Sequence, residues 1–135
     1  MPDRSAVLAA VDAAYAARQR SDKKELASHF APGATFRIVG RSELMGFDAG
    51  PIDAMAAIGG LIDLFRFHRM ERLHVAIEGN VAVIHWRIEV STADSKHEIT
   101  ELCDIWTFDD NLKVSSVVEF GDTGLIAHMA AAATA

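Results

Sequence analysis

The sequence predicts an α+β fold in which a curved antiparallel sheet wraps around N-terminal helices and encloses a cone-shaped cavity. Helical periodicity dominates the first half of the chain, and long stretches of alternating apolar and polar residues follow it. A last helical segment comes after these stretches. The chain has 135 residues, the length of one domain, so we expect residues 1–135 to form a single unit.

Composition argues against nucleic-acid and membrane partners. The net charge is −6, whereas a nucleic-acid surface needs a basic patch. No apolar run reaches the roughly 18 residues of a spanning helix, and the first residues lack the basic and apolar regions of a signal peptide. The one cysteine, Cys103, excludes an internal disulfide. We therefore expect a cytoplasmic protein.

Two long helices are predicted before the main run of strands. The first ends near residue 20 and places Val11, Tyr15 and Arg18 on one inward face at three- and four-residue steps. The other begins at Pro51, a favoured first position of a helix, and covers residues 51–68. It is apolar around most of its circumference, which is typical of a helix buried on more than one side.

A short helix and a short strand are predicted between these two helices. Asp22 and Glu25 have the spacing of a capping box, which starts the short helix. Residues 35–39 then alternate as a strand does, with Phe36 and Ile38 on one side.

Four long antiparallel strands and a helix complete the predicted fold. Val, Ile, Trp and Phe are frequent in these stretches, as strands prefer, and Asn and Asp residues separate them as turns. Asp122 is placed to cap the final helix, expected over residues 123–131. The predicted strands cover residues 69–77, 81–91, 98–108 and 113–120.

One acidic residue lies on an apolar strand face. In the strand over residues 98–108, alternation places Asp104 on the same side as Leu102, Trp106 and Phe108. A carboxylate in such surroundings costs free energy unless it has partners, so we expect burial to raise its pKa. Asp104 is therefore the first candidate for a functional acid.

The last strand leaves the position of a second acid open. One parity turns Glu119 inward with Ser115 and Val117, next to Asp104. The other parity turns Val118 and its alternating neighbours inward and leaves Glu119 in solvent, because the apolar residues of this strand do not alternate cleanly.

The remaining polar residues predict no metal site or cofactor. The six histidines have neither the helical spacing nor the cysteine partners of a metal centre, and we expect them at the surface or the cavity rim. The outer face of the sheet is apolar, which predicts a homodimer formed through that face. Its apolar residues are Val81, Val83, Ile99, Cys103 and Ile105.

Several short motifs, in this order of elements, carry a resemblance to a known fold. They are Ala-Pro-Gly-Ala-Thr-Phe at residues 31–36, Trp-Arg-Ile-Glu-Val at 86–90, Cys-Asp-Ile-Trp-Thr-Phe-Asp-Asp at 103–110 and Glu-Phe-Gly-Asp-Thr at 119–123. Together they resemble the nuclear transport factor two-like superfold, particularly its SnoaL-like and ketosteroid-isomerase-like members. The resemblance implies a cavity between helices and sheet, but the superfold hosts isomerases, dehydratases, cyclases, epoxide hydrolases and non-catalytic domains.

The resemblance also implies roles for individual residues. Ketosteroid isomerases use an aspartate base, a tyrosine and a protonated aspartic acid. Asp104 is similar in position to the protonated acid, Tyr15 lies within about one residue of the tyrosine, and Trp86 resembles an aromatic pocket wall. Ile38 stands where the base should be, which argues against ketosteroid isomerisation by that mechanism.

Two functional hypotheses follow. In the first, Asp104 and Tyr15 polarise an oxygen of a small apolar carbonyl compound, while Glu119, a histidine or water moves a proton in a cofactor-independent isomerisation, dehydration or cyclisation. In the second, the chain is a non-catalytic ligand-binding or dimeric interaction domain of the same fold, as the missing base favours. The predicted cavity residues are Tyr15, Phe36, Ile38, Phe65, Trp86, Leu102, Asp104 and Trp106.

Overall fold

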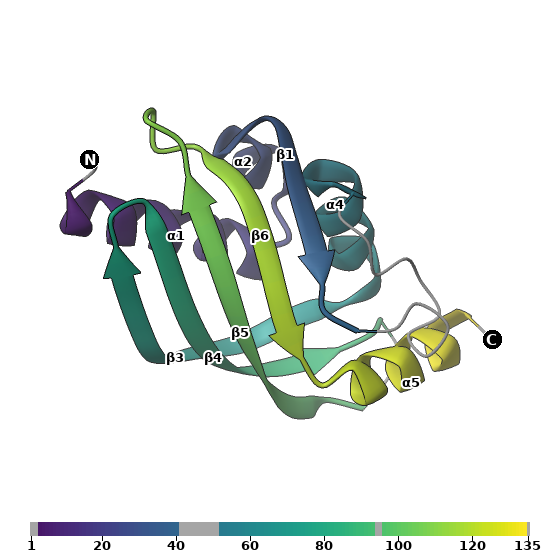
Figure 1. The fold of residues 1–135 in the computed structure, drawn as a ribbon. Helices are drawn as coiled ribbons and strands as arrows, with labels where there is room; N and C mark the ends of the chain where they lie inside the picture. The colour runs from purple at the N-terminus through teal and green to yellow at the C-terminus, as the bar shows by residue number, and fades with distance from the viewer. Residues whose placement is uncertain (1–2, 41–51, 94–95, 135) are drawn as a thin grey trace.

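The predicted α+β fold is confirmed. The computed structural model describes residues 3–40, 52–93 and 96–134, and a curved sheet holds helices on its concave side (Figure 1). Among the described residues the elements are α1 (Arg4–Gln19), α2 (Lys23–Ser28), β1 (Phe30–Ile38), β2 (Ile52–Asp53), α4 (Ala54–Leu64), β3 (Arg66–Glu78), β4 (Val81–Ser91), β5 (Glu98–Phe108), β6 (Val114–Gly121) and α5 (Thr123–Thr134).

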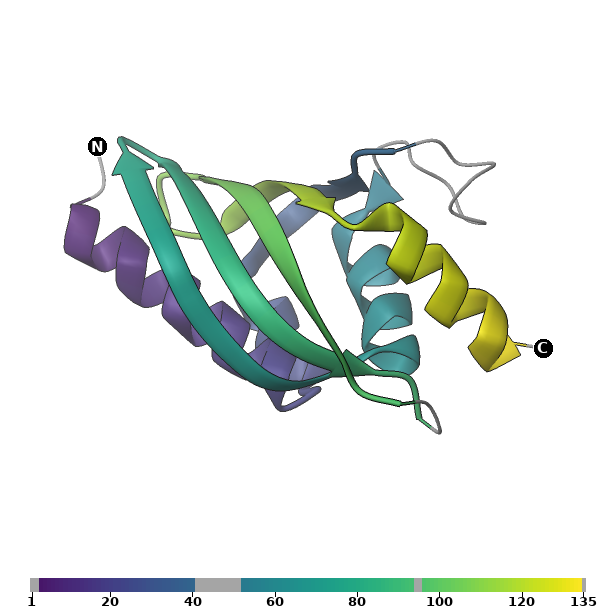
Figure 2. The same cartoon turned by 90° about the horizontal axis from the view of Figure 1, so that it is seen from below.

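The sheet has the strand order β2-β1-β6-β5-β4-β3. The antiparallel run from β3 to β6 is the one predicted, and each strand pairs with the next along the chain. β1 joins the other side of β6 in parallel, so the sheet is mixed. Viewed from below, the curved strands arch over α1 and α4 (Figure 2).

β4 shows why the sheet has one buried face. Its alternate residues, from Ala82 to Val90, are all buried, whereas Arg87 on the opposite face is exposed. Branched and aromatic side chains on a single face pack against the helices and exclude water from the core. The same alternation buries Leu102, Asp104 and the two aromatic residues that follow them in β5.

The third predicted helix is shorter than expected, and its boundary with β3 was wrong. α4 ends at Leu64, and β3 begins at Arg66 rather than at residue 69. Arg66 and Phe67 pair with Ser91 and Val90 at the end of β4, so cross-strand pairing outweighs the helical pattern there. The predicted first residue of the helix, Pro51, lies outside the described residues. Within them, Asp53 caps α4.

β1 is longer than predicted. It begins at Phe30, five residues before the expected strand, and its register against β6 shifts between Phe30 and Thr35. Gly33 lies in this irregular part with φ of 77°, a conformation that glycine adopts without a steric penalty. The shift leaves Phe36 and Ile38 facing the core, as the alternation predicts.

β6 contains an irregularity that settles its two possible parities. Thr107 pairs with Ser116, but Phe108 pairs with Val114, so Ser115 is an extra residue in the ladder. Because of this bulge, Val114 and Val117 are both buried although they are three residues apart.

The chain after β6 forms α5, capped as predicted. The backbone N–H of Leu125 donates to the Asp122 carboxylate at 3.0 Å, and the helix continues to Thr134. No helix in the described part of the chain has both the length and the apolar character needed to cross a bilayer.

Candidate functional site

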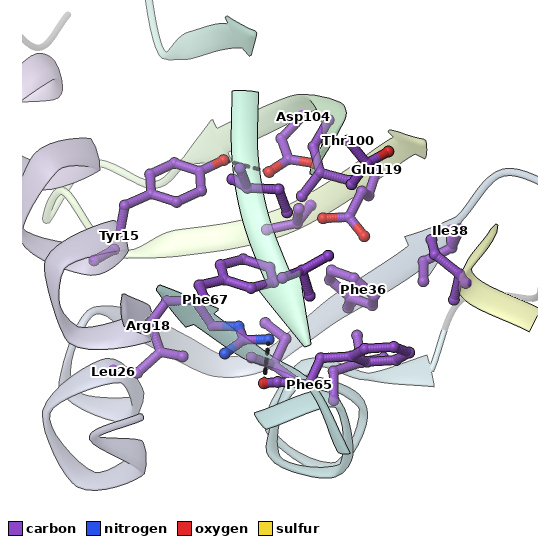
Figure 3. Close-up of a pocket in the computed structure, with 18 of the residues that line it drawn as sticks. Tyr15, Arg18, Leu26, Phe36, Ile38, Phe65, Phe67, Thr100, Asp104 and Glu119 are labelled. Atoms are coloured by element: carbon purple, nitrogen blue, oxygen red, sulfur yellow. Dashed lines mark hydrogen bonds between the residues drawn. The ribbon is translucent and has the colours of Figure 1, made fainter. Parts of the chain in front are cut away.

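A largely apolar cavity of about 80 Å³ lies between the concave face of the sheet and the helices (Figure 3). Most of the predicted site residues line it: Tyr15, Phe36, Ile38, Phe65, Leu102, Asp104, Trp106 and Glu119. The wall also contains residues that the sequence did not single out for the site, among them Arg18, Phe67, Thr100 and Leu26.

Asp104 is the buried acid that the strand alternation predicts. It lies on β5 and is only 2% exposed. The hydroxyl of Tyr15, on α1, donates a hydrogen bond to its Oδ2. Its Oδ1 is buried without a hydrogen-bond partner among the described residues. Oδ2 is thus held by the helix, and Glu119 and Trp106 are further hydrogen-bonding neighbours that lower the pKa of Asp104.

Glu119 faces the same cavity from the neighbouring strand. It pairs directly with Asp104 across the β5–β6 ladder, and directly paired residues of an antiparallel sheet point to the same side. The bulge at Ser115 turns this part of β6 inward. Of the two parities that the sequence left open, the one that places Glu119 next to Asp104 is the observed one.

The pKa values of both carboxyl groups are raised above their ordinary values. Burial raises the pKa of Asp104 to about 6, against the opposing effect of the hydrogen bond that Tyr15 donates to its charged form. The pKa of Glu119 is raised well above its ordinary value, first by burial and then by the charge of Asp104. The pair therefore retains a proton at higher pH than two separate carboxyl groups would.

The predicted rise of the Asp104 pKa is confirmed in direction. The hydrogen bond from Tyr15 favours the ionised form of Asp104, and the charge of Arg18 lowers the pKa of Glu119. The neutral state expected for Asp104 from the sequence stays a prediction.

Tyr15 is a firmly protonated donor. Burial and the neighbouring Asp104 raise its pKa well above 10.0, so the hydroxyl keeps its proton across the physiological range. Its ring packs against Trp86 and Trp106, with centroid distances of 4.7 and 4.9 Å. These contacts orient the phenol toward Asp104.

Trp86 occupies a different place from the one expected. It is buried against the ring of Tyr15 and is not among the residues that line the cavity. Trp106 does line the cavity and lies near enough to Asp104 to lower its pKa. Neither indole N–H makes a hydrogen bond of ordinary geometry to a described residue.

Arg18 is the charged residue of the cavity that the sequence did not mark as functional. It lies on α1 nearly one turn beyond Tyr15 and is 8% exposed. Its Nη2 donates to the backbone carbonyl of Phe65 at 3.2 Å, and its guanidinium carbon lies 3.8 Å from the ring centroid of Phe67. The sequence feature that could have marked Arg18 as a site residue is the position of a charged side chain on the apolar face of α1.

The histidines do not line the cavity. None of the six is among the residues that line it. His68 and His97 stack with ring centroids 4.0 Å apart, and the His85 ring nitrogen lies 2.6 Å from the Glu101 carboxylate. Among the residues described, no group of three or more potential metal ligands lies together.

The chain belongs to the SnoaL-like domain family, because the model of that family matches residues 11–128. The predicted resemblance is thereby confirmed at the level of the family. A search of curated proteins finds no match to this chain.

Solved structures from fungi and bacteria share the fold over nearly the whole chain. The pinacolase BvnE from Penicillium brevicompactum has 18% identity and a TM-score of 0.73, covering 98% of this chain and 99% of its own. An LEH-like epoxide hydrolase from M. tuberculosis has 13% identity and a TM-score of 0.71, with coverage of 99% and 100%. AusH from Aspergillus nidulans has 20% identity and a TM-score of 0.70, with coverage of 90% and 87%.

Proposed function

We propose that this protein is a cofactor-independent isomerase that moves a proton within a small, largely apolar carbonyl compound. The observation that carries the proposal is the direct pairing of Asp104 with Glu119, two buried carboxyl groups with raised pKa values, in one apolar cavity. Two carboxyl groups that share a proton can act as a base and an acid at the same pH, and we assign the base to Asp104 and the acid to Glu119.

The proposed reaction passes through an enol. Asp104 removes a proton from the carbon next to the carbonyl group, and the electrons of that C–H bond form the carbon–carbon double bond. The carboxylic acid of Glu119 donates its proton to the carbonyl oxygen as the C=O π bond opens. Glu119 then takes the enol proton back, and Asp104 returns its proton to a different carbon. Both residues end in their starting states.

Tyr15 acts in this scheme as a positioning residue. Its hydroxyl donates to Oδ2 of Asp104, which leaves Oδ1 to accept the substrate proton. The same bond keeps the pKa of Asp104 near 6, so that the base is ionised at neutral pH and is still basic enough to take a proton.

The cavity sets a limit on substrate size. Its volume of about 80 Å³ is smaller than the roughly 150 Å³ cavity that holds benzene in another protein. A five-membered cyclic ketone is therefore a suitable probe. Two solved structures of the same fold are named as a pinacolase and an epoxide hydrolase, so an enzymatic role is compatible with this architecture.

The test is the isomerisation of 3-cyclopentenone to its conjugated isomer, followed by ultraviolet absorbance, with deuterium uptake from D2O measured by NMR. We expect Asp104→Asn and Glu119→Gln each to slow turnover by about 10²–10⁴-fold. The exposed Asp110→Asn and Glu78→Gln variants are the matched controls. Equal rates in the wild type and both cavity variants would contradict the proposal.

A second candidate function is ligand binding without chemistry. Ile38, buried in the cavity wall, stands where the resemblance to ketosteroid isomerases requires the base, and this observation favours it. Binding of the ketone without deuterium uptake at any pH would support a binding domain instead of an isomerase.

A further inference from the structure

The cavity contains a buried cation whose hydrogen-bonding capacity is only partly used. Arg18 is more than nine-tenths buried, and its Nη1 has no hydrogen-bond partner among the described residues. A guanidinium has five N–H donors, and leaving them unpaired away from water is costly. A hydrogen-bond acceptor on a bound ligand would pair with the free donors of Arg18 and would explain why they are unpaired here.

The guanidinium is held in place and stays charged. The Phe65 carbonyl accepts one hydrogen bond from it, and the Phe67 ring lies against its face. Burial lowers its pKa only to about 10, so it is a cation at neutral pH. Figure 3 shows the head group of Arg18 entering the space that Asp104 and Glu119 face from the sheet.

The charge of Arg18 lacks a counterion within ion-pair distance among the described residues. Glu119 is the acid whose charge interacts with Arg18, but the two side chains do not form an ion pair. Asp104 is bonded to Tyr15. The cavity thus has a cation on its helix side and an acid–base pair on its sheet side.

We infer that Arg18 binds a carboxylate of the substrate, so that the substrate is a small apolar oxo acid. This inference rests on the proposed function and adds the substrate class. A planar guanidinium fork matches the two oxygens of a carboxylate. The ionised Asp104 repels a second anion, so the carboxylate at Arg18 orients the substrate with its carbonyl group toward Asp104 and Glu119.

The test compares crotonate with its neutral isostere crotonamide at pH 7. Binding is followed by NMR through the indole N–H signals of the two tryptophans, because Trp106 lines the cavity and Trp86 does not. We expect crotonate to bind at least tenfold more tightly than crotonamide and to shift the Trp106 signal more strongly. Equal or tighter binding of the amide by the wild type would overturn the inference.

Two variants locate the preference at Arg18. Arg18→Met should reduce the ratio of the two dissociation constants to about one, whereas the exposed Arg20→Met control should preserve it. Arg18→Lys keeps the charge but loses the fork, so an intermediate ratio is expected. If Arg18→Met still binds crotonate more tightly than crotonamide by the wild-type ratio, the inference is wrong. If Arg18→Met does not fold, the same unchanged ratio in Arg18→Lys would show that the inference is wrong.

This binding test is independent of the proposed reaction. Selectivity for the anion requires no proton transfer, and the isomerisation of 3-cyclopentenone requires no carboxylate. A negative result in the binding test therefore does not contradict the isomerase proposal, and a negative result in the isomerisation test does not contradict anion binding at Arg18.

Discussion

Replacing Asp104 with Asn should stabilise the protein at neutral pH. Burial raises the pKa of Asp104 from 3.8 to about 6, so the folded state holds this proton more tightly than the unfolded chain does. The contribution of such a group to stability is complete below pH 3.8 and is lost as the pH rises through 6. A tenfold change in proton affinity corresponds to about 1.4 kcal/mol, so the loss at pH 7 is about 3 kcal/mol.

The Asn variant has no proton to lose, and its amide oxygen can still accept from Tyr15. We expect Asp104→Asn to exceed the wild type in free energy of unfolding by up to about 3 kcal/mol at pH 7. At pH 4 the folded state holds the Asp104 proton and the unfolded chain holds it in part, so most of the advantage should disappear there.

The assay is urea denaturation at pH 7 and pH 4, followed by tryptophan fluorescence. Asp110→Asn, which alters an exposed turn residue, measures the background. The reasoning would be refuted if the free energies of unfolding of Asp104→Asn and the wild type differed by the same amount at both pH values. That result would mean that Asp104 has the same pKa in the folded and unfolded states.

Three further predictions concern other residues. Tyr15→Phe removes the donor to the Asp104 carboxylate, so the acid limb of the pH–rate profile for 3-cyclopentenone should move to higher pH; an unmoved limb would argue against a positioning role. We propose that the apolar outer face of the sheet, where Ile99 is 69% and Phe120 is 43% exposed, pairs with a second copy of the chain. Sedimentation equilibrium should then show a dimer that Phe120→Lys dissociates, and a monomeric wild type would rule this out. Ile84→Ala, at a fully buried position, should cost about 2–5 kcal/mol in urea denaturation, and a loss below about 1 kcal/mol would contradict its place in the core.

Alternation predicted the central strands well. β4 and β5 begin and end where their patterns of apolar and polar residues do. Both strands have one face in the core, so buried and exposed residues alternate along them. This alternation appears in the sequence as a regular pattern of apolar and polar residues. The pairing of Asp104 with Tyr15 was open to prediction for the same reason, because both lie on strongly periodic apolar faces.

Features that depend on pairing between distant residues were harder to predict. The start of β3 at Arg66 depends on its partner Ser91 in β4, which no local pattern records. The inward position of Glu119 depends on the bulge at Ser115, which breaks the alternation of β6.

The coupling of the two carboxyl groups and the unpaired donors of Arg18 also lay beyond the sequence pattern. The apolar neighbours of Asp104 predicted a raised pKa, but its interactions with a donor from α1 and an acid from β6 are visible only in the tertiary structure. Arg18 belonged to the predicted inward stripe, yet only the tertiary structure shows that its donors remain partly unused.

The most direct test of the acid–base pair is a carbon-13 NMR titration of the aspartate and glutamate side-chain carboxyl groups, with Asp104→Asn and Glu119→Gln used for assignment. The account predicts that Asp104 titrates near pH 6 and that Glu119 remains protonated after Asp104 has ionised. Titration of both groups at their ordinary values, or ionisation of Glu119 before Asp104, would contradict it.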